Sequence, residues 1–471
     1  MSPLARDRDR PSSNEAALAK GAVPGAGQNV VVVGLASSGM AAALALAARG
    51  AAVLVTESRP REEVAEEAGR LEGAGVRVAA GGHRPSDLEE ADLVVTSPGV
   101  PDGAPVLMWA RKRGIPIWSE LELGARLAHC PYVAVTGTNG KTTTTEMIAG
   151  AMRTAGLDAI SCGNVGYPFS VAAGENHAAL SVEVSSFQLR FHRSFHPRVS
   201  VLLNLAPDHL DWHGTFEAYR DSKRRIFELQ RGDDVHVGNR DDAQAAEVSR
   251  EASCRLVWFT LAEPRDGEVG YVGGHLVSRL DEERDLGPMP WQTPWLLANV
   301  AAAAAAAISF GLPAQEVAEA LRRFRPLPHR GDLVAEIAGV RFVDDSKATN
   351  PHAALASIQG HERVVLIAGG LSKGVDLAPL ASAAPRIEAV VAIGEAAKEV
   401  AAVFRGLTPV RLASSIDEAV AQAFDLAQPG GTVLLAPACA SQDMFTDYAE
   451  RGERFASAAR AVQDHRGAAR A

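Results

Sequence analysis

The sequence predicts an α/β protein of three domains, each built around a parallel β-sheet. Length is the first reason, because 471 residues exceed a single compact core and suit about three domains of ordinary size. The second reason is a recurring pattern in which a short apolar run ends at a polar or glycine-bearing turn and a helical pattern follows. This alternation is typical of parallel sheets covered by helices.

Composition argues against several classes of protein. The chain has 47 basic and 57 acidic residues, a net charge of −10, and no basic block that could follow a nucleic-acid backbone. The longest apolar run, residues 300–308, is nearly all alanine and far below the roughly 18 residues that suggest a membrane span. The four cysteines are scattered and no secretory signal precedes them, which favours reduced thiols. We expect a cytoplasmic protein without a membrane span or a nucleic-acid partner.

Residues 1–28 lack apolar periodicity and are predicted to form a disordered tail. The first domain is predicted over residues 29–118, where strands at 30–33 and 52–56 flank a helix in a Rossmann-like pattern. The turn at 34–39 lacks the middle glycine that lets a dinucleotide approach, so NAD is not expected. Glu57 and Gly99 follow strand ends where open α/β sheets bind ligands. A module that binds no ligand is the alternative.

The second domain is predicted over residues 119–326 and contains a phosphate-binding loop. An apolar strand enters the loop Gly137–Gly140, and Lys141 with four threonines opens a helix. Backbone N–H groups and the positive helix end suit phosphates, Lys141 suits the β- and γ-phosphates, and Thr142 or Thr143 suits Mg²⁺. The loop is short, with two residues between its glycines, and a simple helix-capping turn is the alternative reading. The pattern predicts a P-loop ATPase-type domain.

Two polar side chains follow other strands of this predicted domain. Glu183 ends a strand, and His209 follows another; both are expected beside the phosphate loop, where a divalent cation could bind. On residue type alone, His209 is as readily a structural histidine as a ligand. Lys223 lies on a helix rich in charge, and its composition predicts a solvated surface lysine.

The third domain, residues 327–471, is predicted to be a second Rossmann-like unit with a parallel sheet. Arg330 could clamp a triphosphate, Asp345 could hold a ribose, and Lys347, Thr349 and Asn350 offer donors to an anionic substrate. Further loops at 369–374 and 436–448 place small and hydroxyl-bearing residues after strands. Each loop alone could be ordinary turn chemistry. Several loops at one sheet edge predict a substrate site.

With the phosphate loop, Glu183, His209, Lys223 and the segment 345–350 together, the chain resembles the Mur ligases of bacterial peptidoglycan synthesis over residues 29 to about 460. Segments 327–330, 345–350 and 441–445 resemble the branch that adds D-glutamate to UDP-N-acetylmuramoyl-L-alanine. The resemblance implies an ATP-dependent ligase that acts through an acyl phosphate, with two Mg²⁺ ions. A histidine ligand favours tolerance of Mn²⁺, and we expect a monomeric chain. The alternatives are a sister ligase that adds another amino acid and a non-catalytic sensor of UDP-sugar or ATP.

The resemblance also implies roles for individual residues. The implied catalytic residues are Lys141, His209 and Lys223. The implied ATP-binding residues are Gly137, Thr138, Asn139, Gly140, Lys141, Thr142, Thr143, Asn299, Arg330 and Asp345. The implied UDP-sugar-binding residues are Ser37, Ser38, Glu57, Gly99, Asn164, Ser185 and Gln188. The implied D-glutamate-binding residues are Thr349, Lys373, Ser441 and Tyr448. The implied metal ligands are Thr142, Glu183, His209 and Lys223, the last as a carbamate.

Two positions depart from the family pattern. Trp295-Leu296 stands where the family often has His-Asn, so an adenine contact is expected to be lost or replaced. Tyr448 stands where phenylalanine is usual, and a tyrosine at this place remains compatible with binding D-glutamate.

Overall fold

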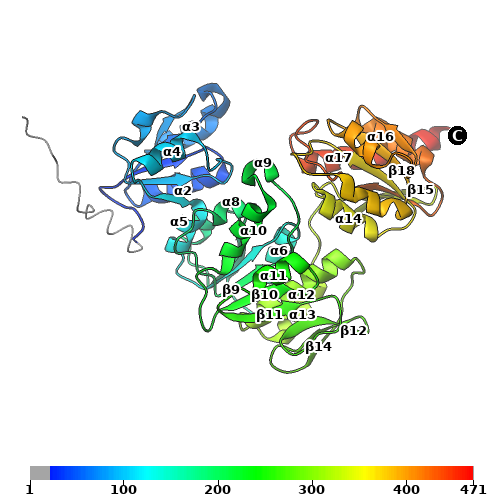
Figure 1. Cartoon of the computed structure of the whole chain (residues 1–471), viewed down its shortest axis with the longest axis horizontal. Helices are drawn as coiled ribbons and strands as arrows, with labels where there is room; N and C mark the ends of the chain where they lie inside the picture. The colour runs from blue at the N-terminus through cyan, green and yellow to red at the C-terminus, as the bar shows by residue number, and fades with distance from the viewer. Residues whose placement is uncertain (1–21, 470–471) are drawn as a thin grey trace, which may run out of the picture.

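The computed structural model describes residues 22–469, with side chains to residue 462, and contains three α/β units that follow one another along the chain (Figure 1). The predicted fold class is confirmed, since each unit has its own β-sheet flanked by helices. Residues 1–21 of the predicted tail lie outside the described part. Residues 22–28 do not behave as a free tail, because Val23 packs against the buried core of the first unit.

The first unit is a five-stranded parallel sheet of strand order β3-β2-β1-β4-β5. Because β2, β1 and β4 are neighbours, the turns after them meet at one edge of the sheet. The strands are β1 (Asn29–Val33), β2 (Ala52–Thr56), β3 (Arg77–Ala79), β4 (Leu93–Thr96) and β5 (Ile117–Ser119). The helices are α2 (Ser37–Ala48), η1 (Arg61–Val64), α3 (Ala65–Gly73), η2 (Pro85–Leu88) and α4 (Pro105–Lys112).

The second unit is built on a nine-stranded sheet of order β14-β13-β12-β11-β10-β9-β6-β8-β7. Its strands are β6 (Tyr132–Thr136), β7 (Ala159–Gly163), β8 (Ala179–Glu183), β9 (Val199–Leu202), β10 (Val235–Asn239), β11 (Arg255–Phe259), β12 (Glu268–Val272), β13 (His275–Ser278) and β14 (Arg284–Pro288). Its helices are α5 (Glu120–Leu127), α6 (Lys141–Thr154), α7 (Phe169–Ala172), α8 (Ser186–Leu189), α9 (Leu210–His213), α10 (Phe216–Arg224), η3 (Arg225–Phe227), α11 (Ala243–Ser249), α12 (Pro294–Ser309) and α13 (Ala314–Arg323).

The third unit has a six-stranded sheet of order β15-β16-β20-β17-β18-β19. Its strands are β15 (Asp332–Ile337), β16 (Val340–Asp344), β17 (Val364–Gly369), β18 (Ile387–Ile393), β19 (Val410–Leu412) and β20 (Thr432–Leu435). Its helices are α14 (Pro351–Gln359), η4 (Ala378–Arg386), α15 (Ala397–Val403), α16 (Ile416–Leu426) and α17 (Tyr448–Ala469).

The last two sheets differ from the parallel sheets that the sequence predicts, because each has an antiparallel edge. Strands β12, β13 and β14 pair antiparallel, and so do β15 and β16. Tight turns cause both departures. Gly273 and Gly274 join β12 to β13, and Ala338 and Gly339 join β15 to β16, all four with positive φ. Two residues with positive φ favour the tight turns that link antiparallel neighbours.

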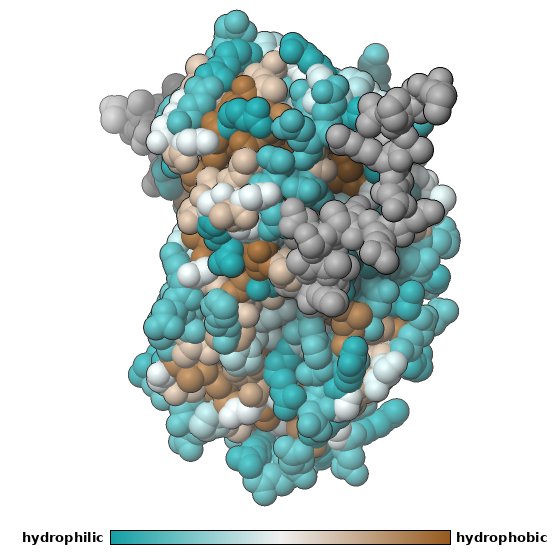
Figure 2. Space-filling model, turned by 90° about the vertical axis from the view of Figure 1, so that its left-hand side faces the viewer, coloured by the Kyte–Doolittle hydropathy of each residue, from teal (hydrophilic) through white to brown (hydrophobic). Residues whose placement is uncertain are grey.

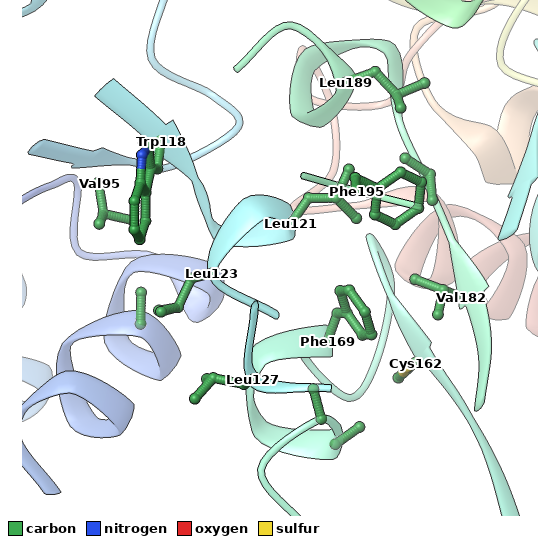
Figure 3. Close-up of a cluster of buried hydrophobic side chains, with 14 of the residues drawn as sticks. Val95, Trp118, Leu121, Leu123, Leu127, Cys162, Phe169, Val182, Leu189 and Phe195 are labelled. Carbon is green, nitrogen blue, oxygen red and sulfur yellow. The ribbon is translucent and has the colours of Figure 1, made fainter. Parts of the chain in front are cut away.

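A shared core fixes the first unit on the second (Figure 3). Val95 and Trp118 of the first sheet belong to the same buried cluster as Phe169 and Phe195 of the second unit, with α5 contributing Leu121 and its neighbours between them. The ring of Phe169 packs edge-on against that of Phe195, with centroids 6.3 Å apart. Burying large aromatic side chains at this junction stabilises the arrangement of the two units.

On the face shown in Figure 2, brown apolar groups lie among teal polar ones where the described residues are visible. Among the described residues, no helix is both long and apolar enough to cross a bilayer.

Candidate active site

A cavity of about 640 Å³ lies between the second and third units. The carboxyl ends of β6 and β8 open onto it from one side, and loops that follow β16, β17 and β20 close it from the other. Many of the residues singled out from the sequence line this cavity, and they come from segments up to about 300 positions apart. They are Thr138, Asn139, Gly140, Lys141, Thr142, Thr143, Asn164, Glu183, His209, Asn299, Arg330, Asp345, Thr349, Lys373, Ser441 and Tyr448.

The phosphate loop has the strand–loop–helix form that its sequence predicts. Strand β6 is buried along its length, and Gly140 precedes α6 with φ +86, in the left-handed region. The Lys141 ammonium donates to the carbonyls of Gly137 and Thr138, at 3.0 and 2.9 Å. Burial lowers the pKa of Lys141. These two bonds fold the lysine side chain over its own loop. Lys141 lies at the positive end of α6, a helix of 14 residues, where anions are favoured.

Replacing Gly140 with alanine is expected to weaken nucleotide binding. A Cβ at this position would overlap the Asn299 carboxamide. In addition, the φ of +86 is strained for any residue other than glycine. We expect the Kd for ATP with Mg²⁺ to rise about 5- to 150-fold, the effect of roughly 1–3 kcal/mol of strain. Titration calorimetry measures this change.

Gly150→Ala is the matched control for this substitution, because it lies in the same helix and an added Cβ there meets no atom within 4 Å. This control should bind ATP normally and melt at a slightly higher temperature, since alanine favours a helix interior. Unchanged ATP affinity in Gly140→Ala would contradict the requirement for glycine.

Residues that follow β9, together with Tyr219 of α10, hold the loop in place. The Thr138 hydroxyl donates to the Ala206 carbonyl at 3.1 Å and lies 3.0 Å from the Tyr219 hydroxyl. The Asn139 backbone N–H donates to the Asn204 side chain at 2.8 Å, which in turn donates to the Asn139 carbonyl at 3.1 Å. These bonds come from the segment that follows β9, so the loop geometry is fixed before any ligand binds.

The residues beside the loop suit a hard cation that is shared with a ligand. Glu183 is 3% exposed; its Oε1 accepts from Asn164 at 3.0 Å, whereas Oε2 accepts no hydrogen bond from the described residues. The Thr143 hydroxyl is also buried without such a partner. Within residues 22–469, no group of three or more His, Cys, Asp or Glu side chains could hold a metal alone. This donor set fits Mg²⁺, which usually binds one or two carboxylates together with water and phosphate oxygens.

His209 lies at the edge of the same cavity. It precedes α9 with φ 53, and its Nε2 is 3.8 Å from an Asp208 carboxylate oxygen. Burial lowers the pKa of His209, which favours the neutral ring. Phe187 contacts the ring edge-on, with centroids 4.9 Å apart. A neutral imidazole can accept a proton or bind a metal.

Lys223 is not the solvated surface lysine that its charged helix predicts. It is 2% exposed and donates from Nζ to the Gly137 carbonyl at 2.8 Å, directly beneath the phosphate loop. The expectation is wrong because α10 is amphipathic: Tyr219, Ser222 and Lys223 form its buried side. Lys223 itself does not line the cavity wall, and neither do Gly137, Ser185 and Gln188.

Three charged side chains of the third unit face the loop across the cavity. The Arg330 guanidinium makes no hydrogen bond or ion pair with the described residues, and burial lowers its pKa. Burial raises the pKa of Asp345 to about 7 and lowers that of Lys347 to about 8. The Lys347 ammonium lies 3.7 Å from the centroid of the Tyr448 ring, a cation–π contact. These groups leave charged donors available to a ligand.

Arg451 is a structural residue of this site that sequence reasoning missed. It is 1% exposed and donates to the Ser346 carbonyl at 2.8 Å and to the carbonyls of Cys439 and Ala440 at 3.2 and 3.3 Å. It thereby joins the segment after β16 to the segment before Ser441. No local pattern marks it, because its partners are backbone carbonyls distant in sequence.

Comparisons with known proteins agree with this geometry. Three family models match consecutive parts of the chain: "Mur ligase MurD-like, N-terminal domain" at residues 28–119, "Mur ligase middle domain" at 135–307 and "Mur ligase, glutamate ligase domain" at 329–439. A curated relative, UDP-N-acetylmuramoylalanine–D-glutamate ligase of Frankia casuarinae, is 46% identical over 93% of this chain and 94% of its own length. The chain belongs to the Mur ligase family. It is therefore an ATP-dependent amide-bond ligase.

Further relatives agree with this assignment. The proteins of the same name from Geobacter metallireducens and Streptomyces avermitilis are 40% and 41% identical, each over 93% of this chain and 98% of their own length. Among solved structures, the MurF ligase of Thermotoga maritima in complex with ADP has a TM-score of 0.58 at 16% identity, covering 88% of this chain and 96% of its own. That likeness concerns the fold alone.

In this Mur ligase four of the residues named for UDP-sugar binding lie in the first unit, away from Asn164 in the cavity. Ser37 and Ser38 begin α2, Glu57 follows β2 and Gly99 follows β4, so they share the carboxyl edge of the first sheet. Both carboxylate oxygens of Glu57 accept hydrogen bonds from nearby backbone. Oε2 accepts from the Leu35 N–H at 2.7 Å, and Oε1 accepts from the Arg59 N–H at 3.0 Å. Burial opposes ionisation of Glu57, but the bonds from Arg59 and Leu35 outweigh it and lower the pKa to about 2.

Two further residues named for UDP-sugar binding, Ser185 and Gln188, cap a helix of the second unit. The Ser185 hydroxyl accepts from the Gln188 N–H at 3.3 Å, and the Gln188 carboxamide oxygen accepts from the Ser185 N–H at 3.0 Å. This reciprocal pair is a capping box at the start of α8. Gln188 is 0% exposed.

The departure at Trp295-Leu296 also has a structural account. Trp295 lines the cavity of this Mur ligase, whereas Leu296 points into the core and is 3% exposed. Leu296 therefore offers no polar group where the family often has asparagine, and the indole of Trp295 lies beside Gly331 of the third unit.

Proposed function

We propose that this Mur ligase joins D-glutamate to UDP-N-acetylmuramoyl-L-alanine, using ATP and passing through an acyl phosphate. The single observation that carries the proposal is the shared cavity. It places the phosphate loop and Glu183 of the second unit opposite Arg330, Asp345 and the segment 345–350 of the third. The names of the curated relatives support the choice of substrates.

ATP is proposed to bind with its phosphates on residues 137–143. Lys141 would release its two loop carbonyls and contact the β- and γ-phosphates, while Arg330 contacts them from the third unit. Asp345 would accept from the ribose, and Asn299 would meet the nucleotide beside Gly140. The turns after β1, β2 and β4, which carry Ser37, Ser38, Glu57 and Gly99, are proposed to hold the uridine diphosphate of the other substrate. Asn164 of the second unit is proposed to contact the sugar of that substrate.

Thr142, Glu183, His209 and a carbamylated Lys223 are proposed to hold two Mg²⁺ ions, with Mn²⁺ tolerated because one ligand is an imidazole. The unpartnered Oε2 of Glu183 supports a cation at this place. Mg²⁺ supplies positive charge that neutralises the phosphoryl oxygens as the transfer proceeds.

The chemistry requires two successive attacks. A carboxylate oxygen of the L-alanyl group attacks the γ-phosphorus of ATP, the bond to the bridging oxygen breaks, and ADP leaves. The amine of D-glutamate then attacks the acyl carbon, loses a proton, and the tetrahedral intermediate expels phosphate. Lys141 and Arg330 would stabilise charge on the transferred group. The neutral imidazole of His209 is proposed to help accept the proton of the amine.

D-Glutamate is proposed to bind at Thr349, Lys373, Ser441 and Tyr448. Its two carboxylates require cationic and hydroxyl donors, and these four side chains line the same cavity. One chain supplies the whole cavity, which supports a monomer as the working unit. We place the reaction in the cytoplasm because ATP is a co-substrate.

The test is phosphate release from ATP and Mg²⁺ in the presence of UDP-N-acetylmuramoyl-L-alanine, with D-glutamate, L-glutamate, L-alanine or a diamino acid as acceptor. We expect release with D-glutamate at least about a hundredfold faster than with any other acceptor, because buried polar groups left unpaired by the wrong substrate carry a large penalty. Preference for another amino acid would indicate a sister ligase. No release with any acceptor would favour a sensor of UDP-sugar or ATP.

A further inference from the structure

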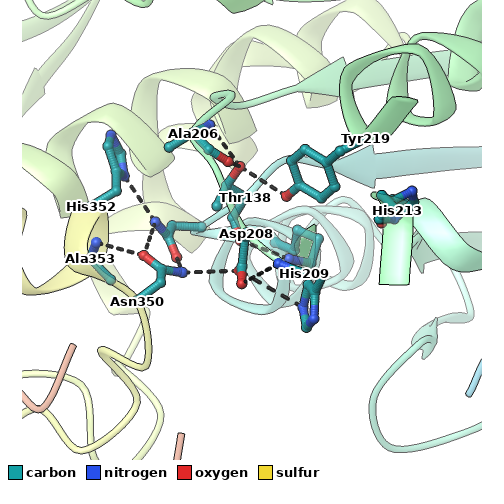
Figure 4. Close-up of polar contacts among 12 residues, drawn as sticks. Thr138, Ala206, Asp208, His209, His213, Tyr219, Asn350, His352 and Ala353 are labelled. Atoms are coloured by element: carbon teal, nitrogen blue, oxygen red, sulfur yellow. Dashed lines mark hydrogen bonds and ion pairs between the residues drawn. The ribbon is translucent and has the colours of Figure 1, made fainter. Parts of the chain in front are cut away.

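We propose that Asn350 is a positioning residue that sets the third unit against the phosphate loop. This inference rests on the proposed function, because it concerns how ATP and D-glutamate are held in one cavity. Asn350 precedes α14, is 4% exposed, and lies at the boundary between the second and third units (Figure 4).

Every hydrogen-bonding position of the Asn350 carboxamide is used. Its Nδ2 donates to Asn139 Oδ1 at 3.1 Å and to Asp208 Oδ2 at 3.2 Å. Its Oδ1 accepts from Asn139 Nδ2 at 3.3 Å and from the Ala353 N–H at 2.9 Å. A primary amide has two donor hydrogens and an oxygen with two lone pairs, so no capacity remains. Three of the four bonds cross from the third unit to the second.

The partners of Asn350 are themselves parts of the site. Asn139 belongs to the phosphate loop, its backbone is held by Asn204, and its Nδ2 also lies 2.9 Å from His352 Nδ1. Burial lowers the pKa of His352, so a neutral ring can accept this bond. Asp208 precedes His209, the proposed metal ligand and base. Asn350 therefore contacts both the phosphate loop and the segment that carries the imidazole.

The position of Asn350 explains what the bonds control. It directly follows Thr349, and Asp345 lies five residues earlier on the same segment, so fixing Asn350 fixes proposed contacts to both D-glutamate and ribose. Released from Asn139 and Asp208, the segment would move with the third unit alone. Both substrates should then bind more weakly, and the reacting groups should be less well aligned.

The competing role for Asn350 is to cap α14, which its Oδ1 does through Ala353. Asn350→Ser separates the two roles, because serine is as good a helix cap as asparagine but is too short to reach Asn139 and Asp208. Asn350→Thr is a second variant that keeps the cap. Ser415→Ala is the stability control, since it removes the cap of α16 in the same unit, and Ser415 does not line the cavity.

The experiment compares these variants in KM for ATP, KM for D-glutamate, kcat and melting temperature. We expect Asn350→Ser and Asn350→Thr to lower kcat/KM for both substrates by about 10- to 100-fold, as loss of two or three hydrogen bonds predicts, with a nearly unchanged melting temperature. Ser415→Ala should melt at a lower temperature and keep its kinetics. Wild-type kinetics in both cap-retaining variants would overturn the proposal.

A double-mutant cycle with Asn139→Ala tests the pairing itself. If the two carboxamides act as a unit, Asn350→Ser should cause little further loss in the Asn139→Ala background. Strictly additive losses would overturn the pairing. Failure of the proposed function is a separate outcome, seen as absent phosphate release in the wild-type enzyme. In that case, we would compare the wild type with Asn350→Ser in two measurements that need no turnover: the Kd for a non-hydrolysable ATP analogue and the change in small-angle scattering on binding it. Identical results for the two proteins would reject the role of Asn350.

Discussion

Replacing Lys223 with methionine is expected to lower kcat by about 10²–10³-fold, the usual cost of removing one preorganised electrostatic group from an active site. Methionine has a similar length and fills the same space without the amine, so the fold should persist. Arginine should fail as well, because a larger guanidinium does not fit a position that is 2% exposed and cannot form a lysine carbamate.

The environment of Lys223 favours the proposed carbamate. Burial, together with the nearby Lys141, lowers its pKa well below the ordinary lysine value and favours the neutral amine. The nitrogen lone pair of a neutral amine can attack CO₂, and loss of one N–H proton then leaves a carbamate anion. A carbamate would present two oxygens beneath the phosphate loop, where Nζ now donates to the Gly137 carbonyl. Oxygen ligands are what a hard divalent cation requires.

Carbon dioxide supply gives an independent measurement. We expect the rate of the wild-type enzyme to fall in buffer freed of CO₂ and to return when bicarbonate is added, and native mass spectrometry to show an adduct equal to one CO₂. Lys398→Met is the matched control, because Lys398 is exposed on α15 and should keep both the adduct and the activity. Lys223→Met that retains activity within about twofold, or a rate indifferent to CO₂ with no adduct, would contradict carbamylation.

Local patterns were sufficient to predict the phosphate loop and the fold class. The residues that mark the loop lie within about ten positions of one another: a buried strand, two glycines and Lys141. The bonds from Asn204 and Ala206 that hold the loop are distant in sequence and were not predictable in this way. The strand ends that carry Glu183 and Asp345 were also predictable, because each parallel sheet brings the carboxyl ends of its own strands to one edge. That both residues line one cavity depends on how the second and third units pack.

Contacts between distant segments could not be predicted in the same way. The burial of Lys223 depends on which side of α10 meets the sheet, and a charged helix conceals that choice in its sequence. The bonds of Asn350 to Asn139, and of Arg451 to the Ser346 carbonyl, depend on how whole units pack. The antiparallel edges could not be predicted from the strand pattern, because they depend on two-residue turns of positive φ between β12 and β13 and between β15 and β16.

Replacing Glu183 with glutamine is the other substitution for which a loss of about 10²–10³-fold in kcat is expected. Glutamine keeps the shape of the side chain and can still accept the bond from Asn164 through its carboxamide oxygen. It removes the negative charge and replaces the unpartnered Oε2 with an NH₂ group, which cannot bind a cation. The Mg²⁺ concentration needed for half-maximal rate should therefore rise, whereas the melting temperature should change little.

Glu120→Gln is the matched control, because Glu120 is also a buried carboxyl group, 1% exposed, in the same unit. Burial raises the pKa of Glu120, which favours its neutral form. Replacing this side chain with a neutral amide therefore changes the charge of the site less than the same replacement at Glu183. Steady-state phosphate release across a Mg²⁺ titration distinguishes the two variants. We expect a large shift for Glu183→Gln and almost none for Glu120→Gln. If both variants shift equally, the loss reflects disturbance of a buried carboxyl group in general, and if neither shifts, Glu183 does not bind the cation on which phosphoryl transfer depends.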